Sequence, residues 1–95
     1  MTNTVEIEDI EQMRLEQGID DVELRAQIRR LRVGDVVRVT FRANANSAQT
    51  VPVRITRIRQ EMTFRGKLTQ RALKVPPGTT VEFTRTHVHS VVKRS

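Results

Sequence analysis

The chain has 95 residues, of which 37% are hydrophobic and 29% charged, and its formal net charge is +6. This length fits one domain, and the absence of cysteine excludes disulfides, thiolate zinc sites and a cysteine nucleophile. No apolar run approaches the ~20 residues of a membrane-spanning helix, and the opening segment MTNTVE has neither the basic nor the apolar part of a signal peptide. We therefore expect a single cytoplasmic domain over residues 1–95, without membrane association.

Charge is divided unevenly along the chain. Residues 1–24 carry eight acidic side chains and one basic one, a net charge of −7, whereas residues 25–95 carry sixteen basic and three acidic ones, a net charge of +13. Fourteen of the 17 basic residues are arginine, whose planar guanidinium binds phosphate and carboxylate in a bidentate manner. The division indicates contact with a polyanion or an acidic arm.

Two helical segments are predicted before the first strand of the barrel. In residues 1–18, Ile7, Ile10 and Met13 recur at every third position, which is typical of one helix face. The hydrophobic positions drift around the helix axis, so this acidic arm is expected to be only loosely helical. It should end at Gly18, because glycine commonly terminates helices.

The second helix, over residues 20–32, has a clearer start signal. Asp20 is the predicted N-cap, because Glu23 then closes a capping box and Ile19 and Leu24 form a hydrophobic staple. An apolar stripe follows on one face of this helix at Leu24, Ile28 and Leu31. The stripe predicts that this helix packs against the rest of the domain.

From residue 35 to residue 92 the hydrophobic period is two, which is typical of half-buried strands. The predicted inward positions are Val37, Val39, Phe41, Val51, Val53, Ile55, Phe64, Leu68, Val81, Phe83, Val88 and either Val91 or Val92. A polar loop is expected at residues 44–49, an edge or bulge at Pro52, and a bulge or twist near Arg57. The predicted fold is α+β, with N-terminal helical segments followed by a five-stranded, highly twisted antiparallel sheet or small, partly open barrel.

A family resemblance rests on five segments: VGDVVRVTF (33–41), VRITRI (53–58), FRGKL (64–68), PGTTVEF (77–83) and HV (87–88). Over residues 31–92 these segments resemble the YegJ-like family of small bacterial barrel domains. The resemblance implies the barrel fold, and it implies no activity, because none is established for that family. The chain departs from the family pattern by lacking tryptophan and by carrying the acidic helical extension.

Neither catalysis nor a metal or other cofactor is predicted. His87 and His89 would project from one face of a strand, but a metal site needs three or four ligands and no cysteine or nearby acid completes one. The serines Ser47, Ser90 and Ser95 have no nucleophile elbow and no paired histidine and acid. We therefore expect a protein that is not an enzyme.

The outward strand positions predict a polyanion-binding surface. The predicted site residues are Arg38, Arg42, Arg54, Arg57, Arg59, Arg65 and Lys67. Arginines on neighbouring strand faces can release counterions from a phosphate backbone. Because the only aromatic residues are phenylalanines at inward positions, binding to RNA or DNA would have little sequence preference.

A protein–protein interaction or structural module is the alternative interpretation. Its acidic N-terminal helix would pack on the basic barrel or bind a partner, and the protein would be a monomer or a weak homodimer. The two interpretations differ in geometry: acids of the helix lying against the arginine face favour the module, and an open, contiguous arginine face favours polyanion binding.

Overall fold

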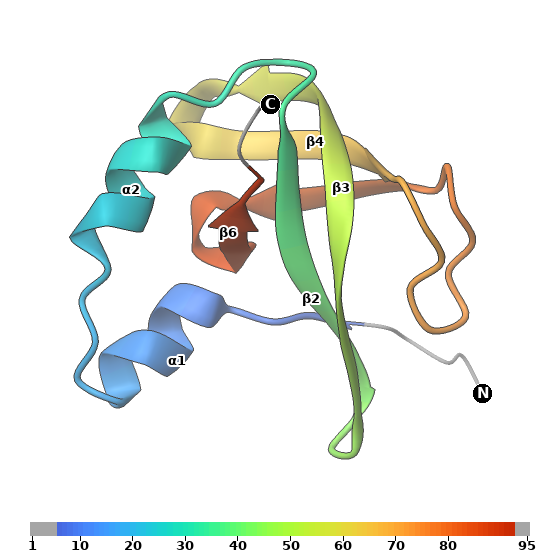
Figure 1. Ribbon diagram of the computed structural model, residues 1–95, viewed down its shortest axis with the longest axis horizontal. Coiled ribbons are helices and arrows are strands. Elements are labelled where there is room, and N and C mark those ends of the chain that lie inside the picture. The colour runs from blue at the N-terminus through green and yellow to red at the C-terminus, as the bar shows by residue number, and fades with distance from the viewer. Residues whose placement is uncertain (1–5, 93–95) are drawn as a thin grey trace.

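The computed structural model describes residues 6–92, apart from the side chain of Glu61. Two short helices precede an antiparallel sheet that curls into a nearly closed barrel (Figure 1). The predicted α+β fold, with five strands after the helices, is confirmed. A two-residue strand, β1 (Glu6–Ile7), adds a sixth strand that was not predicted. Residues 1–5 of the predicted arm and Ser95 lie outside the described residues.

The barrel is a meander whose last strand returns to the first long strand and leaves the barrel nearly closed. The strands are β2 (Val36–Asn44), β3 (Ser47–Arg59), β4 (Thr63–Leu68), β5 (Thr80–Thr84) and β6 (Val88–Val91), with the 3₁₀ turns η1 (Gln60–Met62) before β4 and η2 (Arg85–His87) before β6. Strands β2 to β5 pair in chain order, and β6 returns to pair with β2. Strand β2 therefore has β3 along one side and both β1 and β6 along the other.

The core lies inside the barrel and follows the predicted alternation. Its buried members are Ile28, Val37, Val39, Phe41, Val51, Val53, Ile55, Phe64, Leu68, Ala72, Phe83 and Val88. The rings of Phe64 and Phe83 stack with their centroids 5.5 Å apart. Helix α2 contributes only Ile28 to the buried cluster, so the barrel supplies most of its own apolar interior.

The predicted acidic arm is only partly helical. Helix α1 (Ile10–Glu16) begins at Asp9, whose carboxylate accepts a backbone N–H of the first turn at 2.9 Å. The helix ends just before Gly18, as predicted, where φ is +79°. Ile7 was expected on the apolar face of this helix, but it lies in β1 opposite Phe41. Pairing with β2 satisfies the backbone groups of this segment, which explains the extended conformation.

Helix α2 (Val22–Arg29) is shorter than predicted at both ends, and the predicted N-cap is wrong by one residue. The N-cap is Asp21, whose carboxylate accepts the Leu24 N–H at 2.9 Å. The Asp20 carboxylate forms an ion pair with Arg25. Both aspartates satisfy the local rule for an N-cap, and both also form ion pairs, Asp20 with Arg25 and Asp21 with Arg14.

The connection between β2 and β3 is also shorter than predicted. Residues 44–49 were expected to form a loop, but the strands pair up to Asn44 and Ser47 and leave a two-residue turn. The Asn44 side chain stabilises this turn by accepting the backbone N–H of Asn46 at 2.8 Å. Exposed ends of a hairpin need no apolar alternation, so polar residues there do not exclude a strand.

Strands β3 and β4 are antiparallel neighbours that pack closely together. The irregularity predicted near Arg57 is confirmed as a register shift at Thr56, whose hydroxyl donates to the Arg65 carbonyl at 3.1 Å. Gly66 lies at this contact, and a Cβ there would lie 2.6 Å from a methyl carbon of Val53. Only glycine fits at that distance, so β3 and β4 pack closely on the inner side of the sheet.

Candidate nucleic-acid interface

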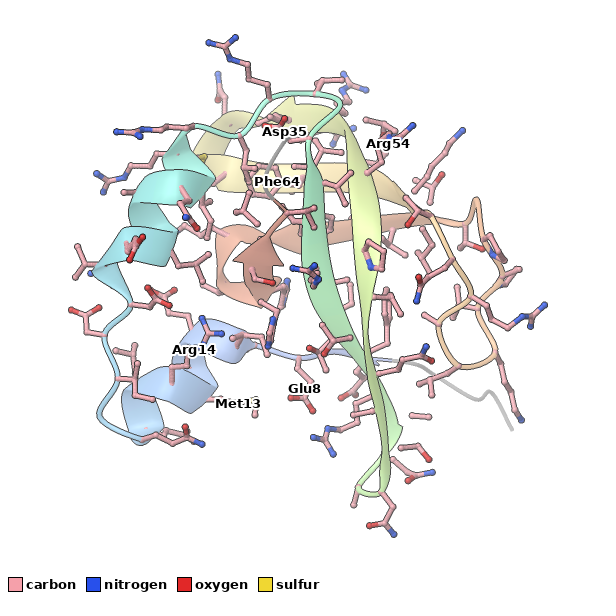
Figure 2. All side chains as sticks on the ribbon, in the orientation of Figure 1. Glu8, Met13, Arg14, Asp35, Arg54 and Phe64 are labelled. Carbon is pink, nitrogen blue, oxygen red and sulfur yellow. The ribbon has the colours of Figure 1, made fainter. Side chains whose placement is uncertain are left out.

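The outer surface of β3 and β4 carries five cations at neighbouring positions. We call this surface, formed by Arg54, Arg57, Arg59, Arg65 and Lys67, the β3–β4 face. Arg54 lies directly opposite Lys67, and Arg57 lies directly opposite Arg65. Arg65 is half-buried and the other four are exposed; Figure 2 shows Arg54 pointing away from the barrel.

The two cross-strand pairs of this face join like charges. Directly opposed residues of antiparallel strands have Cβ atoms about 4.5–5.5 Å apart, and like charges at such positions are destabilising. The two pairs are offset by two residues on β4, which corresponds to about 7 Å along a strand. The register therefore concentrates positive charge within a small area, although this arrangement opposes folding.

Little negative charge compensates the β3–β4 face. The neighbours of the Arg54–Lys67 pair on β2 and β5 are Val36 and Thr80. Within the described side chains, neither member of this pair forms an ion pair. The same holds, for those side chains, for Arg57 and Arg59. The cations thus remain available to a charged ligand.

Among the described side chains, Glu82 is an acid that borders this face. It lies opposite Arg65 in the register of β4 and β5, and its carboxylate accepts a hydrogen bond from Arg65 Nε at 3.1 Å. This hydrogen bond, with the charges of Arg65 and Arg59, holds the pKa of Glu82 below its ordinary value. The sequence pattern does not identify Glu82 as a neighbour of these cations, because cross-strand neighbours follow from the register and not from the alternation of a single strand.

The remaining predicted residues, Arg38 and Arg42, lie on β2. Arg38 is exposed and lies two residues after Val36, which is the residue opposite Arg54. Arg38 is therefore the diagonal neighbour of Arg54 and borders the β3–β4 face. Arg42 forms an ion pair with Glu8, whose side chain is only 10% exposed. The structure therefore brings five of the predicted cations together with Arg38 beside them, and it commits Arg42 to a local contact.

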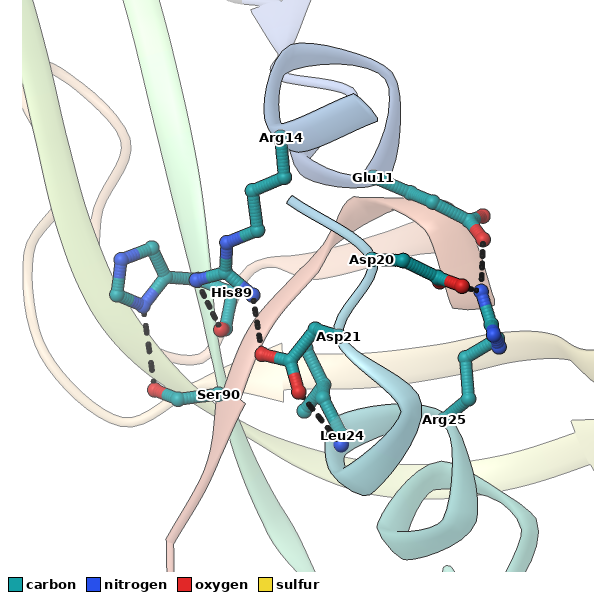
Figure 3. Close-up of polar contacts among 8 residues, drawn as sticks. All are labelled: Glu11, Arg14, Asp20, Asp21, Leu24, Arg25, His89 and Ser90. Carbon is teal, nitrogen blue, oxygen red and sulfur yellow. Dashed lines mark hydrogen bonds and ion pairs between the residues drawn. The ribbon is translucent and has the colours of Figure 1, made fainter. Parts of the chain in front are cut away.

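The acids of the helical segment pair with cations outside the β3–β4 face. Glu11 of α1 lies 3.6 Å from Arg25 of α2 and 3.6 Å from Arg85 of η2. The hydrogen bond from Arg25 to Asp20, followed by the attraction of that carboxylate, raises the pKa of Arg25 above its ordinary value. Figure 3 shows Glu11 and Asp20 converging on the Arg25 guanidinium.

Arg14 makes a second connection between the helices and the barrel. Its Nη1 donates to the Asp21 carboxylate at 3.3 Å, and its Nη2 donates to the carbonyl of His89 on β6 at 3.1 Å (Figure 3). Asp21 therefore caps α2 and binds Arg14 at the same time. These contacts hold both helices beside β6 and η2.

A hollow of about 490 Å³ lies between α1, α2 and the barrel. Its apolar lining consists of Leu15, Ile19, Leu24, Ile28, Met62 and Val88. Of the charged residues around it, Glu11, Arg14, Asp20, Asp21, Arg25 and Arg85 belong to the ion pairs described above. The hollow therefore combines an apolar floor with a rim whose charges are largely matched within the protein.

The two histidines do not share a strand face, so that geometric expectation is wrong. His87 belongs to η2, where its Nδ1 accepts the Thr84 N–H at 3.0 Å. His89 belongs to β6, and its Nδ1 lies 3.2 Å from Ser90 Oγ. Burial lowers the pKa of both rings, and two nearby arginines lower that of His89 further. Among residues 6–92, as far as their side chains are described, no three potential ligands form a metal-binding group.

Comparison with family models, curated proteins and solved structures finds no match to this chain. The resemblance to the YegJ-like family therefore stays a prediction. No helix within the described part of the chain has the length and hydrophobicity needed to cross a membrane.

Proposed function

We propose that this protein is a non-catalytic domain that binds nucleic acid through the phosphate backbone, with the β3–β4 face as its contact surface. The observation that carries the proposal is the direct opposition of Arg54 to Lys67 and of Arg57 to Arg65. Such like-charged pairs oppose folding. A bound phosphate backbone would relieve the repulsion and would release the counterions that accompany nucleic acid in solution.

The distribution of acids supports the proposal. An acidic helix that lay against the arginine face would compete with phosphate for the same guanidinium groups. The helical acids Glu11, Asp20 and Asp21 pair with Arg14, Arg25 and Arg85, and none of these arginines belongs to the β3–β4 face. The negative charge of the helical segment is thus used near β6 and η2. Within the described side chains, four cations of the face have no acidic partner, and the fifth, Arg65, is paired with Glu82.

The expected contacts are to phosphates and not to bases. The three phenylalanines, Phe41, Phe64 and Phe83, are at most 2% exposed, and the chain has no tryptophan or tyrosine. Contacts to phosphate fix the position of a protein but carry no sequence information. We therefore propose RNA or DNA as the partner, with little sequence preference, and a cytoplasmic location in which both are accessible.

Fluorescence anisotropy of a short labelled oligonucleotide tests the proposal. About four phosphate contacts give a slope near −3.6 for log K against log salt, so affinity for a duplex should fall about 150-fold between 50 and 200 mM salt. The variant Arg54→Gln/Arg57→Gln/Lys67→Gln should reduce the slope to about −1. An absence of binding at tens of micromolar protein in low salt would refute the proposal.

A matched control removes the same charge from another surface. Arg29, Arg30 and Arg32 are exposed at the end of α2 and just beyond it, and they do not belong to the β3–β4 face. The variant Arg29→Gln/Arg30→Gln/Arg32→Gln therefore has the same net charge as the variant of the face. It should retain most of the affinity and the salt slope. Equal losses in the two variants would show that net charge alone, and not this face, governs binding.

A further inference from the structure

We infer that the β3–β4 face selects double-stranded nucleic acid over single strands. The inference rests on the proposed function and names its substrate class. It follows from three properties of the described surface: the absence of stacking partners, the two-dimensional arrangement of the cations and the rigidity of the strands that carry them.

Stacking partners for unpaired bases are missing from the face. Proteins that bind single strands derive much of their affinity from bases that stack on exposed aromatic rings. The side chains of Phe64 and Phe83 are 1% and 2% exposed, because both point into the barrel. The outward positions of β3 and β4 in the register hold arginine, lysine and threonine. An unpaired base would therefore meet no aromatic ring on this face.

The cations are spread over two strands and not along one line. Arg54 and Lys67 form one row across the sheet, and Arg57 lies in the next row opposite Arg65, whose guanidinium is paired with Glu82. The rows are about 7 Å apart along the strand, and each row spans about 5 Å between strands. A duplex presents phosphates of both strands, with one charge per about 1.7 Å of its axis, whereas one strand alone supplies half that density. A two-dimensional group of cations is better matched to the denser ligand.

The geometry of the face is fixed before binding. Strand β3 pairs with β2 up to Arg54 and with β4 from Val53 to Arg59, and Gly66 of β4 packs closely against Val53. A duplex is also stiff on this length scale, whereas a flexible single strand loses conformational entropy when its phosphates are placed on a rigid array. Each phosphate contact also releases more counterions from a duplex than from a single strand, about 0.9 counterions against about 0.7.

These values predict the size of the preference. For about four phosphate contacts, the slopes of log K against log salt are near −3.6 for a duplex and near −2.8 for a single strand. The difference corresponds to about tenfold tighter binding of the duplex at 50 mM salt, relative to a 1 M reference. The preference should shrink as the salt concentration rises.

The test compares a labelled DNA strand, the duplex that it forms with its complement and the two RNA equivalents, all with the full chain. We expect tighter binding of both duplexes, with the steeper salt dependence, and a loss of this preference in the folded variant Arg54→Gln/Arg57→Gln/Lys67→Gln. Circular dichroism checks that the variant is folded. Equal or tighter binding of single strands would overturn this inference and leave the proposed function intact. Failure of all four ligands to bind would overturn the proposed function itself.

Discussion

Replacement of Asp21 by alanine should destabilise the protein measurably. The Asp21 carboxylate accepts the Leu24 N–H at 2.9 Å and binds Arg14 at 3.3 Å. Loss of an N-cap costs about 1 kcal/mol, and an ion pair of this exposure adds less than about 1 kcal/mol. We therefore expect the free energy of unfolding to fall by about 1–2 kcal/mol. In a domain of this size each kcal/mol lowers Tm by about 4–8 °C.

Urea unfolding followed by circular dichroism measures this change, and two further variants separate its causes. Asp21→Asn keeps a side-chain oxygen for the Leu24 N–H but removes the charge, so it should retain most of the cap. Asp20→Ala removes the adjacent aspartate, which binds Arg25 at an exposed position, so its effect should be smaller. A loss in Asp20→Ala that equals or exceeds the loss in Asp21→Ala would refute the assigned start of α2.

Three further predictions concern packing, pH and charge. Gly66→Ala should lower the free energy of unfolding by about 1–3 kcal/mol, because its Cβ would meet a Val53 methyl at 2.6 Å; an unchanged thermal melt would contradict this packing. Burial lowers the folded-state pKa of His87 and of His89 from 6.5, so their contribution to stability should be complete above pH 6.5 and be lost as pH falls through the lowered values. Urea unfolding at successive pH values tests this prediction. A free energy of unfolding that rises between neutral pH and about pH 5 would contradict it. Glu82→Gln should tighten oligonucleotide binding and steepen its slope from about −3.6 to about −4.5, because it frees one more cation; weaker binding in the anisotropy assay would count against the β3–β4 face.

The barrel could be predicted because its signal is local and repeated. Alternation along each strand placed Val39 and Val53 inside, since the side-chain period of a strand is two. The phase break near Arg57 likewise located the register shift between β3 and β4. The choice between Asp20 and Asp21 could not be made locally, because both can cap a helix and both also form ion pairs with other turns of the chain.

The sequence predicts which cations of the candidate interface face outward more readily than it predicts which of them become neighbours. The same alternation assigned Arg42 and Arg54 to outward positions without showing which neighbours they have. Pairing partners are set by register over long sequence separations, and here they join Arg54 to Lys67 while Glu8 occupies Arg42. The two-residue β1 strand, which carries Glu8 to that position, has too few residues for a periodic pattern to reveal it.

The structure divides the charges of this chain into two systems with different consequences. Glu11 and Arg14 belong to one system, in which acids and arginines join α1 and α2 to β6 and η2. The β3–β4 face is the other, and its like charges have few acidic neighbours within the described residues. Substitutions in the first system should therefore lower the free energy of unfolding. Substitutions that remove a cation from the second should lower affinity and, because they remove repulsion, should not lower the free energy of unfolding. Exposed ion pairs contribute little to stability, so screening them with salt changes the free energy of unfolding only a little. Salt weakens phosphate binding in proportion to the number of contacts. The two systems should consequently respond differently to ionic strength.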